Sequence, residues 1–142
     1  MKIKEIMATR ILTVPEESTV QEAASLMSEY AVSSLVVTNV LGSYVGIITE
    51  RDLARRVVAL GRPAASTAIR DVMSTTLYTI DGEANLTDAA KIMEEKNIRR
   101  LLITIRGKIK GIVSNRQLLK NIRYELAENL LSAGKEYIRD TY

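Results

Sequence analysis

The sequence contains one pattern twice, and this internal repeat constrains the fold more than any other feature. The block TVQEAASLMSEYAVSSLVVT at 19–38 returns at 85–104 as NLTDAAKIMEEKNIRRLLIT. GIITERDL at 46–53 returns at 111–118 as GIVSNRQL, after one residue has dropped out of the intervening turn. Apolar residues match apolar residues at nearly every paired position. We therefore expect two copies of one structural unit.

The repeats also open alike, since IKEIM at 3–7 returns as IRDVM at 69–73. At 142 residues the chain has room for one compact domain or two small units sharing a core. We predict a first repeat at 1–60, a linker at 61–68, a second repeat at 69–123 and a C-terminal helical extension at 124–142. The extension has no counterpart in the first repeat, so it is a candidate for dimer contact or for docking elsewhere.

Each copy predicts the order strand, helix, strand, strand, helix. Thr19 followed by Glu22 is a capping box, and apolar residues recur at helical spacing after it. Short β-rich runs and glycine-containing turns then predict two strands in each copy, ending near 47–48 and 112–113. One copy of roughly 55 residues buries little surface alone. The predicted fold class is α+β (α/β-like): two tandem β-α-β-β-α repeats packed sheet to sheet with pseudo-two-fold symmetry.

The composition excludes several kinds of chemistry. The sequence has no His and no Cys, so it offers neither a Cys/His zinc site nor a thiol or Ser-His nucleophile. Nothing clusters as a paired acid and base, and no Walker-type or metal-ligand spacing is present. We therefore expect no enzymatic activity, no catalytic cofactor and no metal site.

The sequence gives no sign of a membrane protein. No apolar run approaches the roughly 18 to 20 residues that span a bilayer. The opening MKIKEIMATR is charged and lacks the apolar core of a signal peptide. We expect a cytoplasmic protein without a membrane partner.

Basic residues are concentrated in the second repeat. Between Asn97 and Tyr124 there is no Asp or Glu, while Arg and Lys recur throughout. Such a block favours a nucleotide phosphate, a nucleic acid or an acidic protein face, or it is a solvated surface. Nucleic-acid binding by the 99–123 stretch is therefore an alternative function. The absence of Phe and Trp makes a stacking platform for single strands a poor fit.

The segment GIITERDL carries the most informative polar pattern. Thr49 with Asp52 three residues later is close to a capping box, and Ser114 with Gln117 is one, so both pairs could serve only to begin helices. The same geometry suits a ligand. The start of a helix offers free N–H groups and a positive dipole to a phosphate, and an Asp one turn in offers two oxygens to the paired hydroxyls of a ribose.

The doubled unit, its IKEIM and IRDVM openings, the GIITERDL segment and the Glu-Ala-Ala helix resemble a stand-alone tandem pair of CBS domains, the cystathionine β-synthase family or Bateman module. The resemblance covers about residues 1–123. It implies an adenosyl ligand in a cleft between the repeats, with AMP, ADP or ATP foremost and S-adenosylmethionine or NAD as further members of the set. It also implies a homodimer and a sensor that regulates a separate, unidentified protein.

Carried over by position, the resemblance implies two ligand sites. In the first, Thr49 lies on the phosphate and ribose side, Asp52 binds the ribose hydroxyls, and Arg51 or Arg100 clamps the phosphate. The first site comprises Thr49, Arg51, Asp52, Thr79, Ile80, Ile98, Arg99 and Arg100. The second comprises Thr13, Val14, Val32, Ser33, Ser114, Arg116 and Gln117.

Two departures from the family pattern make these sites unequal. Gln117 stands where the family has Asp, and an amide holds a diol less well than a carboxylate does. Ser33-Ser34 in the first repeat occupy the positions that Arg99-Arg100 occupy in the second, so the two clefts should differ in charge. We expect a strong site at Asp52, a weak or empty one at Gln117, and a nucleotide-sensing regulatory module overall. A ligand-free dimerisation module is the remaining alternative.

Overall fold

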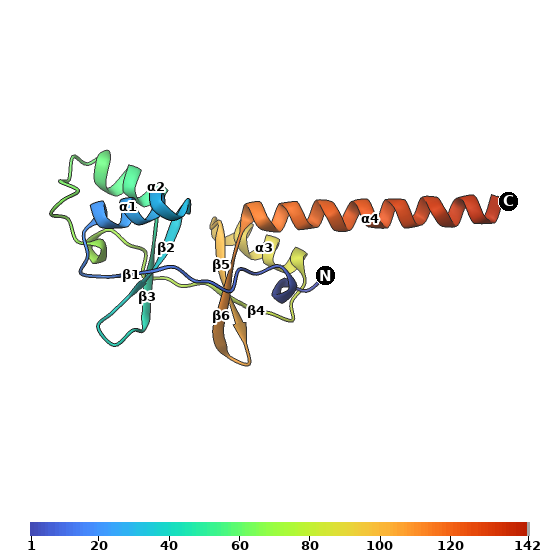
Figure 1. Ribbon diagram of the computed structural model, residues 1–142, viewed down its shortest axis with the longest axis horizontal. Helices are drawn as coiled ribbons and strands as arrows, with labels where there is room; N and C mark the ends of the chain where they lie inside the picture. Colours follow the sequence, from blue (N-terminus) through green and yellow to red (C-terminus); the bar gives the residue numbers. More distant parts are fainter. Residues whose placement is uncertain (142) are drawn as a thin grey trace. The chain divides into compact units, whose positions relative to one another are not determined.

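The computed structural model describes the backbone of residues 1–141 and the side chains of residues 1–134. Each repeat holds three strands and two principal helices, shown in chain order in Figure 1. The first repeat comprises η1 (Ile3–Glu5), β1 (Thr13–Pro15), α1 (Val20–Tyr30), β2 (Ser34–Thr38), β3 (Tyr44–Thr49), α2 (Glu50–Asp52) and η2 (Leu53–Val58). The second comprises η3 (Ile69–Asp71), β4 (Thr79–Asp81), α3 (Leu86–Lys96), β5 (Arg100–Ile105), β6 (Lys108–Ser114) and α4 (Asn115–Thr141).

The two sheets have the same topology. In the first, β1 is parallel to β2 and β2 is antiparallel to β3; β4, β5 and β6 repeat this arrangement. The crossover between the parallel strands is α1 in one copy and α3 in the other, as a parallel pair requires. Register irregularities fall at matching places, Val37/Thr38 and Ile103/Thr104. The predicted α+β class and the strand-helix-strand-strand-helix order are confirmed.

The two main helices, α1 and α3, begin where the sequence predicts, each on a capping residue. The Thr19 hydroxyl accepts from the Glu22 N–H at 3.2 Å, and Asn85 does the same for Asp88 at 3.0 Å. Both helices end on a left-handed residue, Ala31 or Asn97. These caps satisfy backbone groups that a helix leaves without partners at its ends.

The chain divides into two compact units that exchange their leading segments. The first-repeat unit is Ile11–Leu77, and the second-repeat unit combines Met1–Arg10 with Tyr78–Tyr142. The leading segment of the first repeat therefore belongs with the body of the second. The Ile3 N–H donates to the Ala84 carbonyl at 2.8 Å, and the equivalent Ile69 N–H donates to the Ser18 carbonyl at 2.8 Å.

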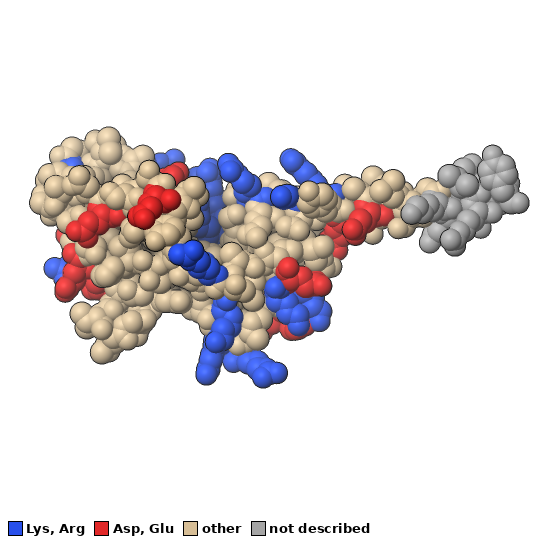
Figure 2. Space-filling model, in the orientation of Figure 1, with Lys and Arg blue, Asp and Glu red and all other residues tan. Residues whose placement is uncertain are grey.

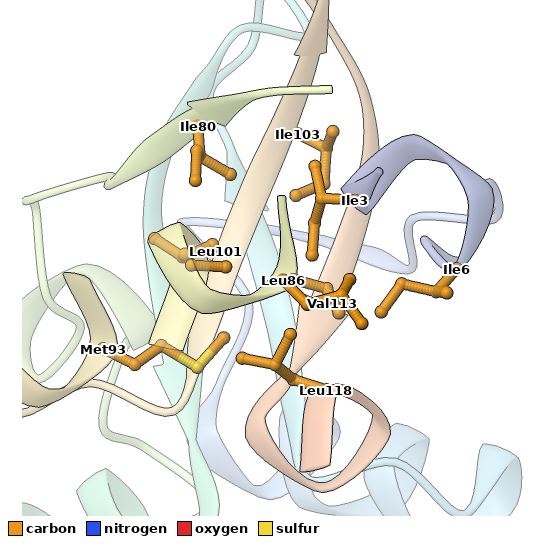
Figure 3. Close-up of a cluster of buried hydrophobic side chains, with 10 residues drawn as sticks. Ile3, Ile6, Ile80, Leu86, Met93, Leu101, Ile103, Val113 and Leu118 are labelled. Carbon is orange, nitrogen blue, oxygen red and sulfur yellow. The ribbon is translucent and has the colours of Figure 1, made fainter. Parts of the chain in front are cut away.

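The exchanged segments contribute to each core. In the second-repeat unit Ile3 is fully buried, and Figure 3 shows it beside Ile103 while Ile6 points toward Val113. In the first-repeat unit Ile69 and Val72 take the equivalent places in the core. Met7 and Met73 pack against the edge of their cores, as expected of gap-filling methionines. Each unit therefore needs its exchanged segment for a complete core.

Gly46 and Gly111 allow the exchanged segments to lie close to the sheets. Ser74 and Ile47 exchange two backbone hydrogen bonds, at 2.9 and 3.0 Å, and Ala8 and Ile112 do so in the other unit. A Cβ on Gly46 would lie 2.6 Å from the Ser74 carbonyl oxygen. Gly46 lies inside β3, which continues to Thr49. Its role is to admit a neighbouring backbone, as a glycine within a strand often does.

Glu83 binds the leading segment Met1–Arg10 at the protein surface, because its exposed carboxylate forms ion pairs with both Lys2 and Lys4. Hydrogen bonds from these two ammonium groups lower the pKa of Glu83 from its ordinary value to about 2, and the same contact raises the pKa of Lys2. A depressed carboxyl pKa means that the stabilisation is complete above the ordinary pKa and is lost as pH falls toward 2. The contact is exposed, so salt weakens it.

Titration of the Glu83 side-chain carboxyl carbon by NMR should therefore show a midpoint near 2. In the variant with Lys2→Ala and Lys4→Ala the midpoint should rise toward the ordinary glutamate value, because both donors are gone. High salt should shift it the same way in the unmodified chain. An ordinary midpoint in the unmodified chain would show that neither lysine holds Glu83.

Candidate functional site

Asp52 is held in a fixed position where β3 meets α2. Its carboxylate Oδ2 accepts from the Thr49 N–H at 3.0 Å, and its own N–H donates to the Thr49 hydroxyl at 3.2 Å. Arg56 Nε lies 3.8 Å from Oδ1, and the Asp52 side chain is 14% exposed. The capping box is therefore complete, and the carboxylate is ordered yet still reachable from solvent.

The expectation of free N–H groups at this helix start is wrong for three of them. The Thr49 and Asp52 N–H groups bond to each other's side chains, and the Glu50 N–H donates to the Ser33 carbonyl at 3.0 Å. In the second repeat the Asn115 N–H likewise donates to the Arg99 carbonyl at 2.8 Å. The acceptors in these last two bonds are the carbonyls of the residues just before β2 and β5. A phosphate here would depend mainly on side-chain cations.

Gln117 has a different role from Asp52. Its N–H donates to the Ser114 hydroxyl at 3.2 Å, while its side-chain nitrogen donates to the Ile6 carbonyl at 2.6 Å. A carboxylate cannot make this second bond because it has no proton to donate. In the first-repeat unit the equivalent carbonyl, that of Val72, accepts from Arg56 Nη1 at 3.0 Å.

Arg56 is the residue that sequence reasoning missed. It donates to the Val72 carbonyl, a contact that the Asp52 carboxylate cannot make, and it lies beside Asp52. The signal was present, because Asp52 and Arg56 have the i, i+4 spacing of a helical ion pair. The chain here continues from α2 into the π-helical η2, and Ala59 N–H donates five residues back to the Ala54 carbonyl.

The predicted site residues fall into two groups, one in each unit. Thr13 and Val14 lie on β1, and Ser33 is joined through its carbonyl to the start of α2. The first-repeat unit holds Thr13, Val14, Val32, Ser33, Thr49, Arg51 and Asp52. The second-repeat unit holds Thr79, Ile80, Ile98, Arg99, Arg100, Ser114, Arg116 and Gln117. Arg100 and Ser114 pair at the end of the β5–β6 hairpin where α4 begins, whereas Thr79 and Ile80 pair with Leu102 and Ile103 further along β5.

The basic stretch extends over both ends of the β5–β6 hairpin. Arg100 pairs with Ser114 at one end of the β5–β6 hairpin, and Arg106 lies in the turn at the other. A strand of this length separates the two ends by about 17 Å. Two further cations, Lys120 and Arg123, lie on α4. This division does not favour a continuous track for a nucleic-acid backbone.

Other site types have little support in the described part of the chain. Among its residues, no three His, Cys, Asp or Glu side chains gather as metal ligands, and no helix is long and apolar enough to cross a membrane. One surface hollow of about 520 Å³ opens beside the start of α1. It is lined by Thr19, Gln21, Glu22, Ser25, Leu26 and Ala65, none of them a predicted site residue.

The protein consists of two α+β repeats in tandem, and each repeat has a polar pair where its last strand meets its last helix. The family model described as "CBS domain" matches residues 3–59 and 69–124. The chain therefore belongs to the CBS domain family and contains two CBS domains in tandem.

Relatives agree with this assignment. The CBS domain-containing protein YhcV of Bacillus subtilis is 38% identical over 119 residues, which span 84% of each chain. A solved structure of an uncharacterised conserved protein from Pyrococcus horikoshii is 37% identical, with a TM-score of 0.79, covering 86% of this chain and 92% of that one. A Burkholderia ambifaria protein with CBS domains, ascribed to signal transduction, is 26% identical, with a TM-score of 0.81, covering 86% and 93%.

Proposed function

We propose that this CBS pair is a regulatory module that binds an adenine nucleotide, AMP, ADP or ATP, at a site built on Thr49 and Asp52. The observation that carries the proposal is that the Asp52 carboxylate is held in place while some of its hydrogen-bond acceptor positions are left unused. An ionised carboxylate has about four acceptor positions. The Thr49 N–H takes one and Arg56 approaches the other oxygen, so about two are left for the paired hydroxyls of a ribose.

The contacts to the phosphate and the base are assigned from the family pattern. Arg51 and Arg100 supply charge for the phosphate, and Thr79, Ile80, Ile98 and Arg99 surround the base. S-adenosylmethionine and NAD share the adenosyl part and fit the same ribose contact. The proposed role is binding without catalysis.

The companion site around Ser114 is proposed to be weak. The side-chain nitrogen of Gln117 is committed to the Ile6 carbonyl, and its single carbonyl oxygen carries no charge. Thr13, Val14, Val32, Ser33 and Arg116 complete this site by position. A chain with one strong and one weak site would bind close to one nucleotide.

Regulation is proposed to act by a population shift. A ligand that binds one arrangement of the repeats, or of a homodimer, more tightly than another raises the population of that arrangement. A separate protein then responds to the difference.

A ligand-free association module is the second candidate. It is favoured by the complete capping box of Thr49 and Asp52, which gives both residues a structural role without any ligand.

Isothermal titration of the full chain with AMP, ADP, ATP, NAD and S-adenosylmethionine tests the proposal, with a duplex oligonucleotide as control at two salt concentrations. Micromolar binding of an adenine nucleotide near one per chain, changing little with salt, is the expected result. Failure of every adenosyl ligand to bind would overturn it. Binding of the duplex alone, steeply weakened by salt, would instead favour the nucleic-acid alternative.

A further inference from the structure

The side chain of Arg56 joins the Asp52 carboxylate to the exchanged segment around Val72. Its Nη1 donates to the Val72 carbonyl at 3.0 Å and to the Met73 carbonyl at 3.3 Å, and its Nε lies 3.8 Å from Asp52 Oδ1. One guanidinium therefore lies between two backbone carbonyls and a carboxylate. Because its N–H groups form a rigid fork, a guanidinium holds such partners in one geometry.

The second repeat holds the equivalent carbonyl with a different residue. The carbonyl of Ile6, which corresponds to that of Val72, accepts from the Gln117 side chain at 2.6 Å. Gln117 corresponds to Asp52 in the sequence repeat. An amide at this position can donate to the carbonyl itself, whereas a carboxylate has no proton to donate. A repeat with Asp at this position requires another donor for the carbonyl, and in the first repeat that donor is Arg56.

The helix that carries Arg56 also differs from its counterpart. Leu53–Val58 forms a π-helix, whereas the equivalent stretch 118–123 belongs to the α-helix α4. The residue equivalent to Arg56 is Asn121, whose side chain donates to the Gln117 carbonyl of its own helix at 2.8 Å. Short π-helical turns are rare and occur frequently at functional sites. The unusual helix geometry and the Asp-Arg pair therefore occur in the same repeat.

The Arg56 contact limits the orientations open to the Asp52 carboxylate. Oδ2 accepts the Thr49 N–H at 3.0 Å while Oδ1 faces Arg56, so the carboxylate is held at both oxygens. One hydroxyl can be bound by a carboxylate in many orientations, but two adjacent hydroxyls require one particular orientation. A carboxylate that already has this orientation loses less freedom on binding, which raises the affinity for a diol.

We propose that Arg56 is a positioning residue of the Asp52 site, and that it sets the preference of this site for a nucleotide with both ribose hydroxyls. This role rests on the proposed function, in which Asp52 binds a ribose. Arg56 acts through Asp52 and touches neither the ribose nor the phosphate.

Nucleotides that lack one ribose hydroxyl test this role. AMP, ADP and ATP, each with its 2′-deoxy form, are titrated calorimetrically into the full chain. The ratio of the two dissociation constants in each pair measures how well Asp52 binds the diol. The unmodified chain should prefer the ribonucleotide by about 10-fold. In Arg56→Ala this preference should fall to about threefold, because the carboxylate gains orientations that suit only one hydroxyl. Loss of a phosphate contact would weaken both members of a pair alike and leave the ratio unchanged.

Arg55→Ala is the matched control, because it removes the same charge from the neighbouring position. Arg55 is exposed. Figure 2 shows Lys and Arg side chains at many separate places on one face of the molecule, and a single exposed charge among them is screened by salt. The preference for the ribonucleotide should keep its unmodified value in Arg55→Ala. Urea denaturation of both variants records their stability, which only Arg56→Ala should lower, since the Val72 carbonyl loses its donor.

Arg56→Gln is the second variant, and it is informative even where Arg56→Ala does not fold. It keeps a side-chain donor for the exchanged segment but places no charge beside Asp52, so the preference should fall in this variant too. A reduced preference in the Arg56 variants and not in Arg55→Ala is the expected result.

An unchanged preference in the folded Arg56 variants would overturn the positioning role while leaving the nucleotide site in place, and Arg56 would then only stabilise the fold. An equal fall in Arg55→Ala would reveal a general effect of charge and would overturn the role as well. If the unmodified chain binds none of the three nucleotides, or binds each as tightly as its deoxy form, then the proposed ribose contact of Asp52 is itself wrong, and the role of Arg56 is overturned with it.

Discussion

Replacing Gly46 with alanine is expected to destabilise the first-repeat unit by about 2–3 kcal/mol. The new Cβ would lie 2.6 Å from the Ser74 carbonyl oxygen and 2.7 Å from the Met73 sulfur. The carbonyl cannot move aside easily, because it accepts the Ile47 N–H at 2.9 Å and belongs to a segment buried through Ile69. Urea denaturation followed by circular dichroism measures the loss.

Alanine substitutions at two other glycines, Gly111 and Gly134, should be progressively less destabilising. Gly111→Ala should cost less, since its closest neighbour is the flexible side chain of Met7 and the Ala8 carbonyl oxygen lies at 3.0 Å. Gly134→Ala, on α4 with nothing within 4 Å, should be stabilising by about 0.5–1 kcal/mol. A Gly46→Ala variant as stable as the unmodified chain would mean that the Met73–Ser74 segment does not lie against β3.

The second large effect is expected on ligand affinity. Asp52→Ala should weaken nucleotide binding by about 10- to 100-fold, because each hydrogen bond to a charged group contributes roughly 1.5–3 kcal/mol. The stability lost with the capping contact should be only about 0.5–2 kcal/mol. Isothermal titration of the variant gives the affinity, and urea denaturation gives the stability.

Asp88→Ala is the matched control for this variant. Asp88 is also an aspartate at the third position of a helix, and its carboxylate accepts the Asn85 N–H at 3.2 Å. Its loss should cost similar stability while leaving nucleotide affinity unchanged. If Asp52→Ala binds nucleotide as tightly as Asp88→Ala does, then Asp52 is a helix cap and no more.

Much of the fold could be predicted because its determinants are local. The capping boxes of Thr19 and Thr49 need only residues three positions apart, and the strands are short apolar runs between turns. Because the sequence is duplicated, each helix or strand predicted in one repeat can be compared with its equivalent in the other. Arg106 and Gly107 have positive φ in a two-residue turn, which the shortened second hairpin accommodates.

The exchange of leading segments could not be predicted, because nothing near Ile3 or Ile69 in the sequence specifies which sheet it joins. That choice depends on hydrogen bonds between residues far apart in the chain, such as Ile3 with Ala84. The double role of Gln117 was hidden for the same reason. From the sequence, the Gln117 amide is only a poorer ribose ligand than a carboxylate. Its hydrogen bond to the Ile6 carbonyl is known only from the structure.

The exchange gives the chain two covalent connections between its units, after Arg10 and after Leu77, and the predicted linker at 61–68 is neither of them. Proteolytic nicking at the exposed stretch 61–66 would therefore not release one CBS domain from the other. Each fragment would still hold a piece of both units, and the nicked protein would persist as a non-covalent pair. The two domains cannot be produced separately by cutting between the repeats.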